Sequence, residues 1–88
     1  MFLHIGGDTV LFSRDILAVF DHEAVKRSRT TRDFIHEFRK RNQLIGWTKD
    51  TVSYIFVCGD SHEEKMYCSP ISCTTLAKRM GFIENIGI

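Results

Sequence analysis

The chain has 88 residues, of which 43% are hydrophobic and 26% are charged. This composition predicts one small globular domain and does not indicate disorder. A domain of this size buries only about 60–65% of its unfolded surface, so oligomerisation is a common route to stability. The net charge of +1 excludes a uniformly basic protein, and no apolar run is long enough to cross a membrane.

The N-terminal part of the chain predicts three strands. Leu3 and Ile5 fall on one face of the first strand. Residues 6–8, Gly-Gly-Asp, supply a tight turn because glycine accepts a positive φ without a Cβ clash. Residues 10–12 run back as the second strand, and the apolar, branched residues 16–20 form the third.

Arg14 interrupts the apolar pattern between the second and third predicted strands. A guanidinium at such a position requires either an acid or an outward-facing partner. One interpretation is an ion pair with Asp15 or with an acid on a neighbouring strand. The other is a contact of its planar fork with a phosphate or a base.

The middle of the chain predicts a loop followed by a helix. Residues 22–28 are polar and charged and are expected to form the loop. Thr30 is the expected N-cap, with Asp33 completing a variant of the capping box, and the helix is expected over residues 31–42. Asn42 is a plausible left-handed terminator. The expected apolar stripe of this helix comprises Phe34, Ile35 and Phe38.

The second half predicts two more strands and a short helix. Residues 52–58 and 65–69 have strand composition, and Ser72 is the expected N-cap of a helix that ends at Gly81. Residues 82–88 carry too little pattern to assign. The predicted fold class is α+β: one domain over residues 1–88, with a mostly antiparallel sheet, a central helix and a C-terminal helix. The sequence also predicts one exposed apolar surface for self-association.

The cations gather in one segment. Seven of the 12 Lys and Arg residues lie between positions 26 and 41, against only Asp33 and Glu37; they are Lys26, Arg27, Arg29, Arg32, Arg39, Lys40 and Arg41. One interpretation is a solvated helix face. The other is a contact surface for the phosphates of double-stranded DNA, since the segment lacks the interleaved aromatic residues that bind single strands.

The sequence predicts neither a cofactor nor a metal site. The three cysteines, Cys58, Cys68 and Cys73, form no CxxC pair, so a zinc site that combines them with His62 is disfavoured. An odd number of cysteines without a signal-peptide pattern predicts free thiols and a cytoplasmic protein. Cys58 is expected to react most slowly, because it lies within a predicted strand. No catalytic constellation is found.

Two motifs carry a resemblance to a known family. The first is His4-Ile5-Gly6-Gly7-Asp8, followed by Val10 and by Ser13-Arg14-Asp15-Ile16. The second is Tyr67-Cys68-Ser69-Pro70-Ile71-Ser72, with Thr75-Leu76 and Lys78-Arg79. Together they resemble the extracellular matrix regulatory proteins, the RemA/RemB family, and are most similar to its RemB-type members.

This resemblance implies a cytoplasmic, non-enzymatic regulator that binds DNA and activates the transcription of biofilm matrix genes. It also implies a LytTR-like subunit that assembles into a closed homo-oligomeric ring whose outer arginines contact DNA. Arg14 matches one of those arginines. Two adjacent arginines of the family correspond to Thr51 and Val52, which leaves Lys49 as the nearby cation.

The resulting prediction is a DNA-binding transcriptional regulator that acts as a symmetric homo-oligomer. Its candidate DNA-contacting residues are Arg14, Arg32, Arg39 and Lys49. The alternative is an oligomeric scaffold that keeps the ring and has lost the DNA contacts. No membrane and no small-molecule substrate are expected, and a small enzyme is disfavoured for want of a site.

Overall fold

The computed structural model describes residues 1–81. It contains six strands, a 3-10 turn and three helices. In chain order they are β1 (Phe2–Gly6), β2 (Thr9–Phe12), η1 (Ser13–Asp15), β3 (Ile16–Asp21), α1 (His22–Arg27), α2 (Arg29–Lys40), β4 (Leu44–Ile45), β5 (Ser53–Cys58), β6 (Glu64–Ser69) and α3 (Cys73–Arg79). None of the described helices has the length and apolar character needed to cross a bilayer.

The strands form two open sheets rather than the single sheet that the sequence predicts. The larger sheet has the order β3-β5-β6-β4, and β1 and β2 form a separate hairpin. All pairings are antiparallel except that of β4 with β6, so the larger sheet is mostly antiparallel as predicted. The hairpin stays separate because η1 turns the chain between β2 and β3 and Ser13 N donates to Met1 O, at 2.9 Å.

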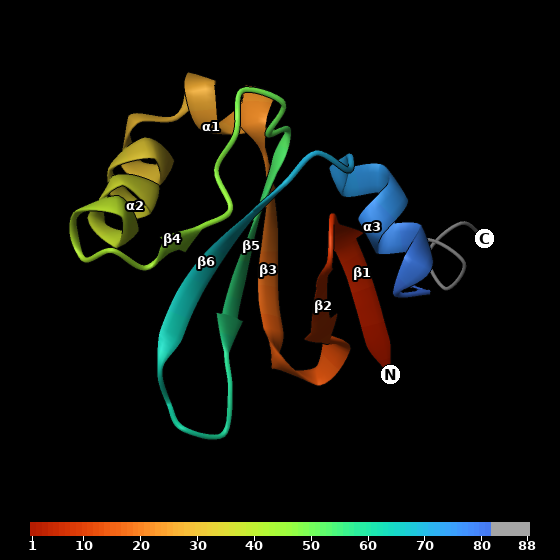
Figure 1. Ribbon diagram of the computed structural model, residues 1–88. Helices are drawn as coiled ribbons and strands as arrows, with labels where there is room; N and C mark the ends of the chain where they lie inside the picture. Colours follow the sequence, from red (N-terminus) through yellow and green to blue (C-terminus); the bar gives the residue numbers. More distant parts are fainter. Residues whose placement is uncertain (82–88) are drawn as a thin grey trace.

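The larger sheet lies between two covering layers (Figure 1). Helices α1 and α2 cover one face, and the β1–β2 hairpin and α3 cover the other. Alternate side chains of β5 point to opposite faces, so Tyr54 packs on the helical side while Ile55 and Val57 pack on the hairpin side. This double burial explains why β5 reads as a nearly continuous apolar run.

Each face has its own apolar core. The core beneath α1 and α2, called here the helical core, comprises Val25, Ile35, Phe38, Tyr54, Met66 and Cys68. The core beneath the hairpin and α3, called here the hairpin core, comprises Leu3, Ile5, Ile55, Val57 and Leu76.

A close backbone approach fastens the hairpin to the larger sheet. The Ser69 hydroxyl donates to the carbonyl of Ile5 at 2.5 Å and accepts from the amide of Ile71 at 3.0 Å. Gly6 has φ +118°, and a Cβ at this position would lie 2.7 Å from Cδ of Pro70. Only glycine fits here without strain, because both its backbone conformation and the available space exclude a side chain.

Two helix starts differ from the sequence prediction. The predicted loop over residues 22–28 contains α1, whose N-cap Asp21 accepts from Ala24 N at 3.3 Å. The N-cap of α2 is Ser28 rather than Thr30, and its hydroxyl accepts from Thr31 N at 3.3 Å. Serine and threonine are both good N-caps, and Ser28 prevails because it can end α1 and begin α2 at the same residue.

The helix ends agree better with the sequence. Asn42 has φ 57° just after α2, which ends at Lys40, and Gly81 has φ 82° after α3. Ser72 caps α3 by accepting from Thr75 N at 3.1 Å. In the predicted stripe of α2, Ile35 and Phe38 are buried, whereas Phe34 is 38% exposed. The tail at residues 82–88 lies outside the described residues.

Candidate functional site

Arg14 lies in η1, at the corner between the hairpin and β3, and its side chain is 68% exposed. Nη2 lies 3.5 Å from Asp60 Oδ2, and Nε lies 3.8 Å from Asp15 Oδ1. The guanidinium also lies over the Phe12 ring, 5.0 Å from its centroid. Such exposed pairs contribute only about 0–1 kcal/mol to stability, so they hold Arg14 weakly and leave it accessible to an anion.

The connection between β4 and β5 contains Lys49, Thr51 and Val52. It lies at the end of the larger sheet opposite to the β2–β3 corner, which contains Arg14 (Figure 1). Thr51 is only 7% exposed, and its hydroxyl accepts from Thr48 N at 3.0 Å, which fixes the turn. Val52 and Lys49 are exposed. The structure therefore does not bring Arg14 and Lys49 together within one subunit.

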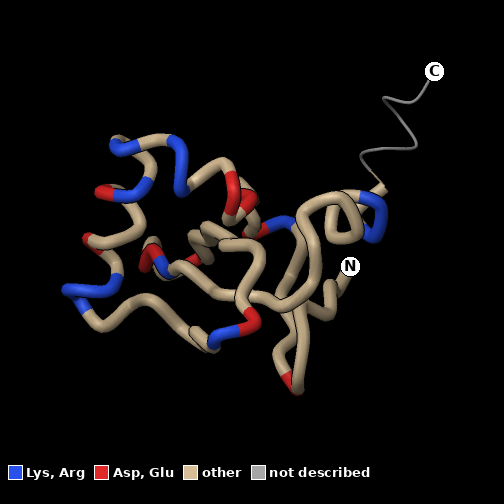
Figure 2. The backbone as a smooth tube through the Cα atoms, turned by 90° about the horizontal axis from the view of Figure 1, so that it is seen from above, with Lys and Arg blue, Asp and Glu red and all other residues tan. Residues whose placement is uncertain are grey.

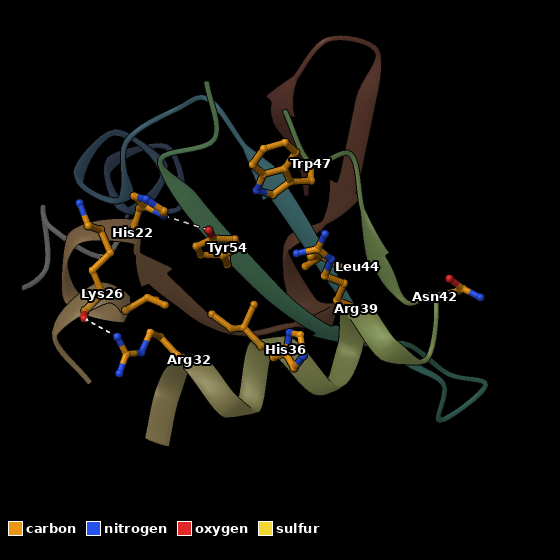
Figure 3. Close-up of a pocket in the computed structure, with 11 residues that line it drawn as sticks. His22, Lys26, Arg32, His36, Arg39, Asn42, Leu44, Trp47 and Tyr54 are labelled. Atoms are coloured by element: carbon orange, nitrogen blue, oxygen red, sulfur yellow. Dashed lines mark hydrogen bonds between the residues drawn. The ribbon is translucent and has the colours of Figure 1, made fainter. Parts of the chain in front are cut away.

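Arg32 and Arg39, by contrast, are brought to one place. With Ile35 and His36 they occupy the i, i+3, i+4 and i+7 positions of α2, which share one side of a helix. This side faces a groove bounded by α1, α2, β4 and β5, with a volume of about 470 Å³. Figure 3 shows Arg39 between His36 and Trp47, with Arg32 beside α1.

We call this cavity the basic groove. It is lined by His22, Val25, Lys26, Arg32, Ile35, His36, Arg39, Asn42, Leu44, Trp47 and Tyr54. Three of these described residues are permanent cations and none is acidic. Figure 2 shows the wider setting, with many of the Lys and Arg positions at the end of the molecule that carries α2.

The polar groups of the basic groove are only partly engaged. Arg32 Nη1 donates to the backbone carbonyl of Lys26 at 3.3 Å, and neither Arg32 nor Arg39 forms an ion pair with an acid among residues 1–81. His22 Nδ1 and Tyr54 Oη lie 2.9 Å apart. Burial, followed by the nearby Cys68, raises the pKa of Tyr54, so its hydroxyl stays neutral as a hydrogen-bonding group.

The thiols do not follow the predicted order of burial. Cys68 is the buried cysteine, and burial raises the pKa of its thiol to about 11. Cys58 is half-buried, because it is the last residue of β5 and lies beyond the helical core. The burial that motivated the expected slow reaction of Cys58 was therefore wrong. Among residues 1–81 no three His, Cys, Asp or Glu side chains are grouped to hold a metal.

Comparison with known proteins identifies the family. The family model described as RemA-like, "Extracellular matrix regulatory protein A-like", matches residues 2–80. The chain is also 30% identical over 86 residues to the extracellular matrix regulatory protein B of Bacillus subtilis (strain 168), covering 98% of each chain. The chain belongs to the RemA-like family. This finding confirms the resemblance drawn from the two sequence motifs.

In this RemA-like chain the two motifs meet in space. The first motif includes the β1–β2 hairpin and η1, and the second runs from the end of β6 into α3. Ser69, Pro70 and Gly6 form their contact. Apart from the exposed Arg14, the motifs therefore mainly build the fold. The basic groove was not predicted, although the helical spacing from Arg32 to Arg39 was a usable signal for its α2 side.

Proposed function

We propose that this RemA-like chain is a non-enzymatic, DNA-binding regulator of extracellular matrix genes. It acts in the cytoplasm as a ring-shaped homo-oligomer of LytTR-like subunits. Family membership supports the regulatory role. The DNA contact and the assembly are proposed from the chain's own surface.

The observation that carries this proposal is the position of Arg14 beside an exposed apolar face. Alternate residues of the hairpin point away from the hairpin core, and Phe2 stacks on Phe12 with ring centroids 4.4 Å apart. The exposed apolar residues of this face are Met1, Phe2, Val10 and Phe12. An apolar face on so small a domain is suited to burial against another subunit.

Self-association through this face would repeat Arg14 at every subunit. A single exposed guanidinium binds a phosphate weakly, but a ring of them binds a duplex with avidity. The duplex would displace Asp15 and Asp60 from Arg14, at a small cost because both ion pairs are exposed.

The experiment is a gel-shift titration of one DNA fragment at two salt concentrations, with the oligomer mass of every variant measured by light scattering. The affinity of the wild type should fall with salt, with a log–log slope of about −0.9 per neutralised phosphate. Arg14→Ala should weaken binding strongly without changing the oligomer mass. Lys78→Ala is the charge-matched control, since Lys78 is exposed on α3, outside the cationic segment of residues 26–41.

Val52→Arg tests whether the β4–β5 connection also faces DNA. Val52 is exposed, whereas Thr51 is buried, so position 52 can present a new arginine without breaking the turn. Stronger binding by Val52→Arg would extend the proposed surface to this end of the sheet. Salt-independent or absent binding by an intact wild-type oligomer would contradict the proposal.

The second candidate function is an oligomeric scaffold without DNA contacts. It is favoured by the two acids that already face Arg14 and by the absence of an arginine at Thr51 and Val52. A stable wild-type oligomer that shows no salt-dependent binding to any DNA fragment would support this scaffold.

A further inference from the structure

The basic groove has the features of a ligand site, and they do not depend on the proposed DNA binding. Its volume of about 470 Å³ lies within the range of small-molecule sites, which is about 300–1,000 Å³. It lies on the helical side of the sheet, away from the apolar face of the hairpin. A groove on this side remains a possible site whether or not the hairpin face is covered.

The charge of the groove selects an anion. Arg32 and Arg39 are two helical turns apart, so their positions on α2 are separated by about 10 Å along the axis. Lys26 adds a third cation, although it also lies 3.8 Å from Glu23. No described acid pairs with either arginine, so a ligand does not compete with an internal carboxylate. Guanidinium groups suit phosphate because their planar fork can donate two parallel hydrogen bonds.

The remaining lining selects a flat, partly apolar group. Val25, Ile35 and Leu44 supply apolar surface, and Tyr54 supplies a ring and a hydroxyl. Trp47 lines the groove but is 60% exposed, so much of the indole is unburied by its own subunit. Figure 3 shows Trp47 on the opposite side of the groove from α2, with Arg39 between them. A heterocycle placed against Trp47 therefore has a guanidinium within reach of its substituents.

We propose that the basic groove binds a nucleoside phosphate. The base packs against Trp47 and the apolar residues, and the phosphates bind Arg39 and Arg32. Base–aromatic stacking and charge-assisted hydrogen bonds then act on two ends of the same molecule. The same chemistry occurs in a free nucleotide and in one unit of a single-stranded nucleic acid. A double helix is disfavoured because its bases are paired and stacked, so none can pack against Trp47 within the groove.

The chain provides its own reporter, because Trp47 is the only tryptophan in the sequence. The experiment titrates the full chain with ATP, AMP, adenosine and a short single-stranded oligonucleotide while the Trp47 fluorescence is measured. We expect a saturable change with ATP, and a weaker or absent one with adenosine, which lacks the phosphate. Saturation by ATP identifies a free nucleotide as the ligand of the basic groove, and saturation by the oligonucleotide alone identifies a single-stranded nucleic acid as the ligand.

Arginine variants connect the signal to the groove. Arg39→Gln and Arg32→Gln should each weaken binding by about tenfold or more, the effect of losing a charged hydrogen bond. Arg27→Gln is the matched control because it removes the same charge at the end of α1 but does not line the groove. Circular dichroism verifies that each variant is folded.

Three results would overturn this inference. One is the absence of a saturable change with either ATP or the oligonucleotide at millimolar concentration. Another is equal weakening by Arg27→Gln and Arg39→Gln, which would indicate general charge attraction. The third is a response to double-stranded DNA alone. Failure of the DNA proposal leaves nucleotide binding intact, because the gel shift and the Trp47 signal are read separately.

Discussion

The two faces of the larger sheet are covered in different ways. On one face the hairpin and α3 enclose the hairpin core, and Ser69 joins the two sheets through the carbonyl of Ile5. On the other face α1 and α2 bury the helical core but leave the basic groove open beside it. One face is closed by the hairpin core and the Ser69 contact, and the other presents Arg32 and Arg39, which pair with no acid among residues 1–81.

Because of this difference, most residues that identify the family lie on one face of the sheet, and the two groove arginines that can bind an anion lie on the other. Much of the two family motifs lies on the closed face, where glycine, serine and proline determine how closely the layers approach. Arg32 and Arg39 belong to neither motif and lie on the open face. A motif match in this chain therefore establishes the fold more firmly than it establishes a ligand.

The largest effect on stability should come from truncating a side chain of the helical core. Phe38 lies on the buried side of α2 and is only 1% exposed, so Phe38→Ala should lower the free energy of unfolding by about 3–5 kcal/mol. Phe34→Ala is the control on the same helix, and it should cost less than half as much because Phe34 is already 38% exposed. Urea denaturation measures both. Equal losses would mean that Phe34 is buried in solution, for example by another subunit.

A slightly smaller effect should come from the joint between the sheets. Gly6→Ala should lower the free energy of unfolding by about 2–4 kcal/mol, because the new Cβ meets Pro70 and the residue has a positive φ. Gly7→Ala separates these causes, since Gly7 has φ +56° but no atom within 4 Å of its Cβ position. Gly7→Ala should lower the free energy of unfolding by about 1–2 kcal/mol, which is the cost of the positive φ alone. Thermal denaturation of both variants should reproduce this order.

The buried thiol should make stability depend on alkaline pH. Burial raises the pKa of the Cys68 thiol from 9.0 to about 11, so the unfolded chain loses this proton at a lower pH than the folded chain does. The free energy of unfolding should therefore fall as pH rises from about 9 to about 11. Burial also raises the pKa of Cys73 and Tyr54, which contribute in the same direction. Cys68→Ala should make the decline shallower, and an unchanged slope would contradict this assignment.

The same burial predicts the order of thiol reactivity. With a thiol reagent under native conditions, Cys68 should react more slowly than Cys58 and Cys73, because it is the buried cysteine and burial raises the pKa of its thiol to about 11. Mass spectrometry of the modified chain resolves the order. Faster labelling of Cys68 would indicate that α2 opens readily from the sheet.

The smallest effect on stability should come from Arg14. Arg14→Ala should change the free energy of unfolding by less than about 1 kcal/mol, because its pairs with Asp15 and Asp60 are exposed. The measurement is urea denaturation beside the Phe38 and Gly6 variants. A larger loss would mean that Arg14 holds the corner between the hairpin and β3, rather than serving a partner.

Local patterns predicted much of the secondary structure. The turn at Gly6, the apolar run of β5 and the cap at Ser72 are decided by neighbouring residues, and all are confirmed. Helix α1 was missed because only Val25 among its six residues is buried, so no apolar period marks it. The separation of the β1–β2 hairpin from the larger sheet and the parallel pair of β4 with β6 depend on contacts between distant segments, which periodicity does not encode.

The candidate site was predicted in part, for the same reason. The concentration of cations around α2 was visible in the sequence, and Arg32 and Arg39 do share a surface. Their apolar and aromatic neighbours were not visible, because Trp47 and Tyr54 come from segments that reach α2 only when β4 and β5 join the sheet. The DNA-contact role of Arg14, Arg32, Arg39 and Lys49 stays a prediction.

The joint between the sheets also affects how the chain folds. Ser69 and Ile5 are 64 positions apart, and Arg79 Nη1 donates to the His4 carbonyl across 75 positions. The hairpin can form locally within microseconds, but docking it requires closure of a loop that includes most of the chain. During synthesis Leu3 and Ile5 emerge early, and the hairpin core stays incomplete until α3 leaves the ribosome. The N-terminal hairpin is therefore among the last segments to dock on the larger sheet. The nascent chain is most exposed to aggregation in the interval before this docking.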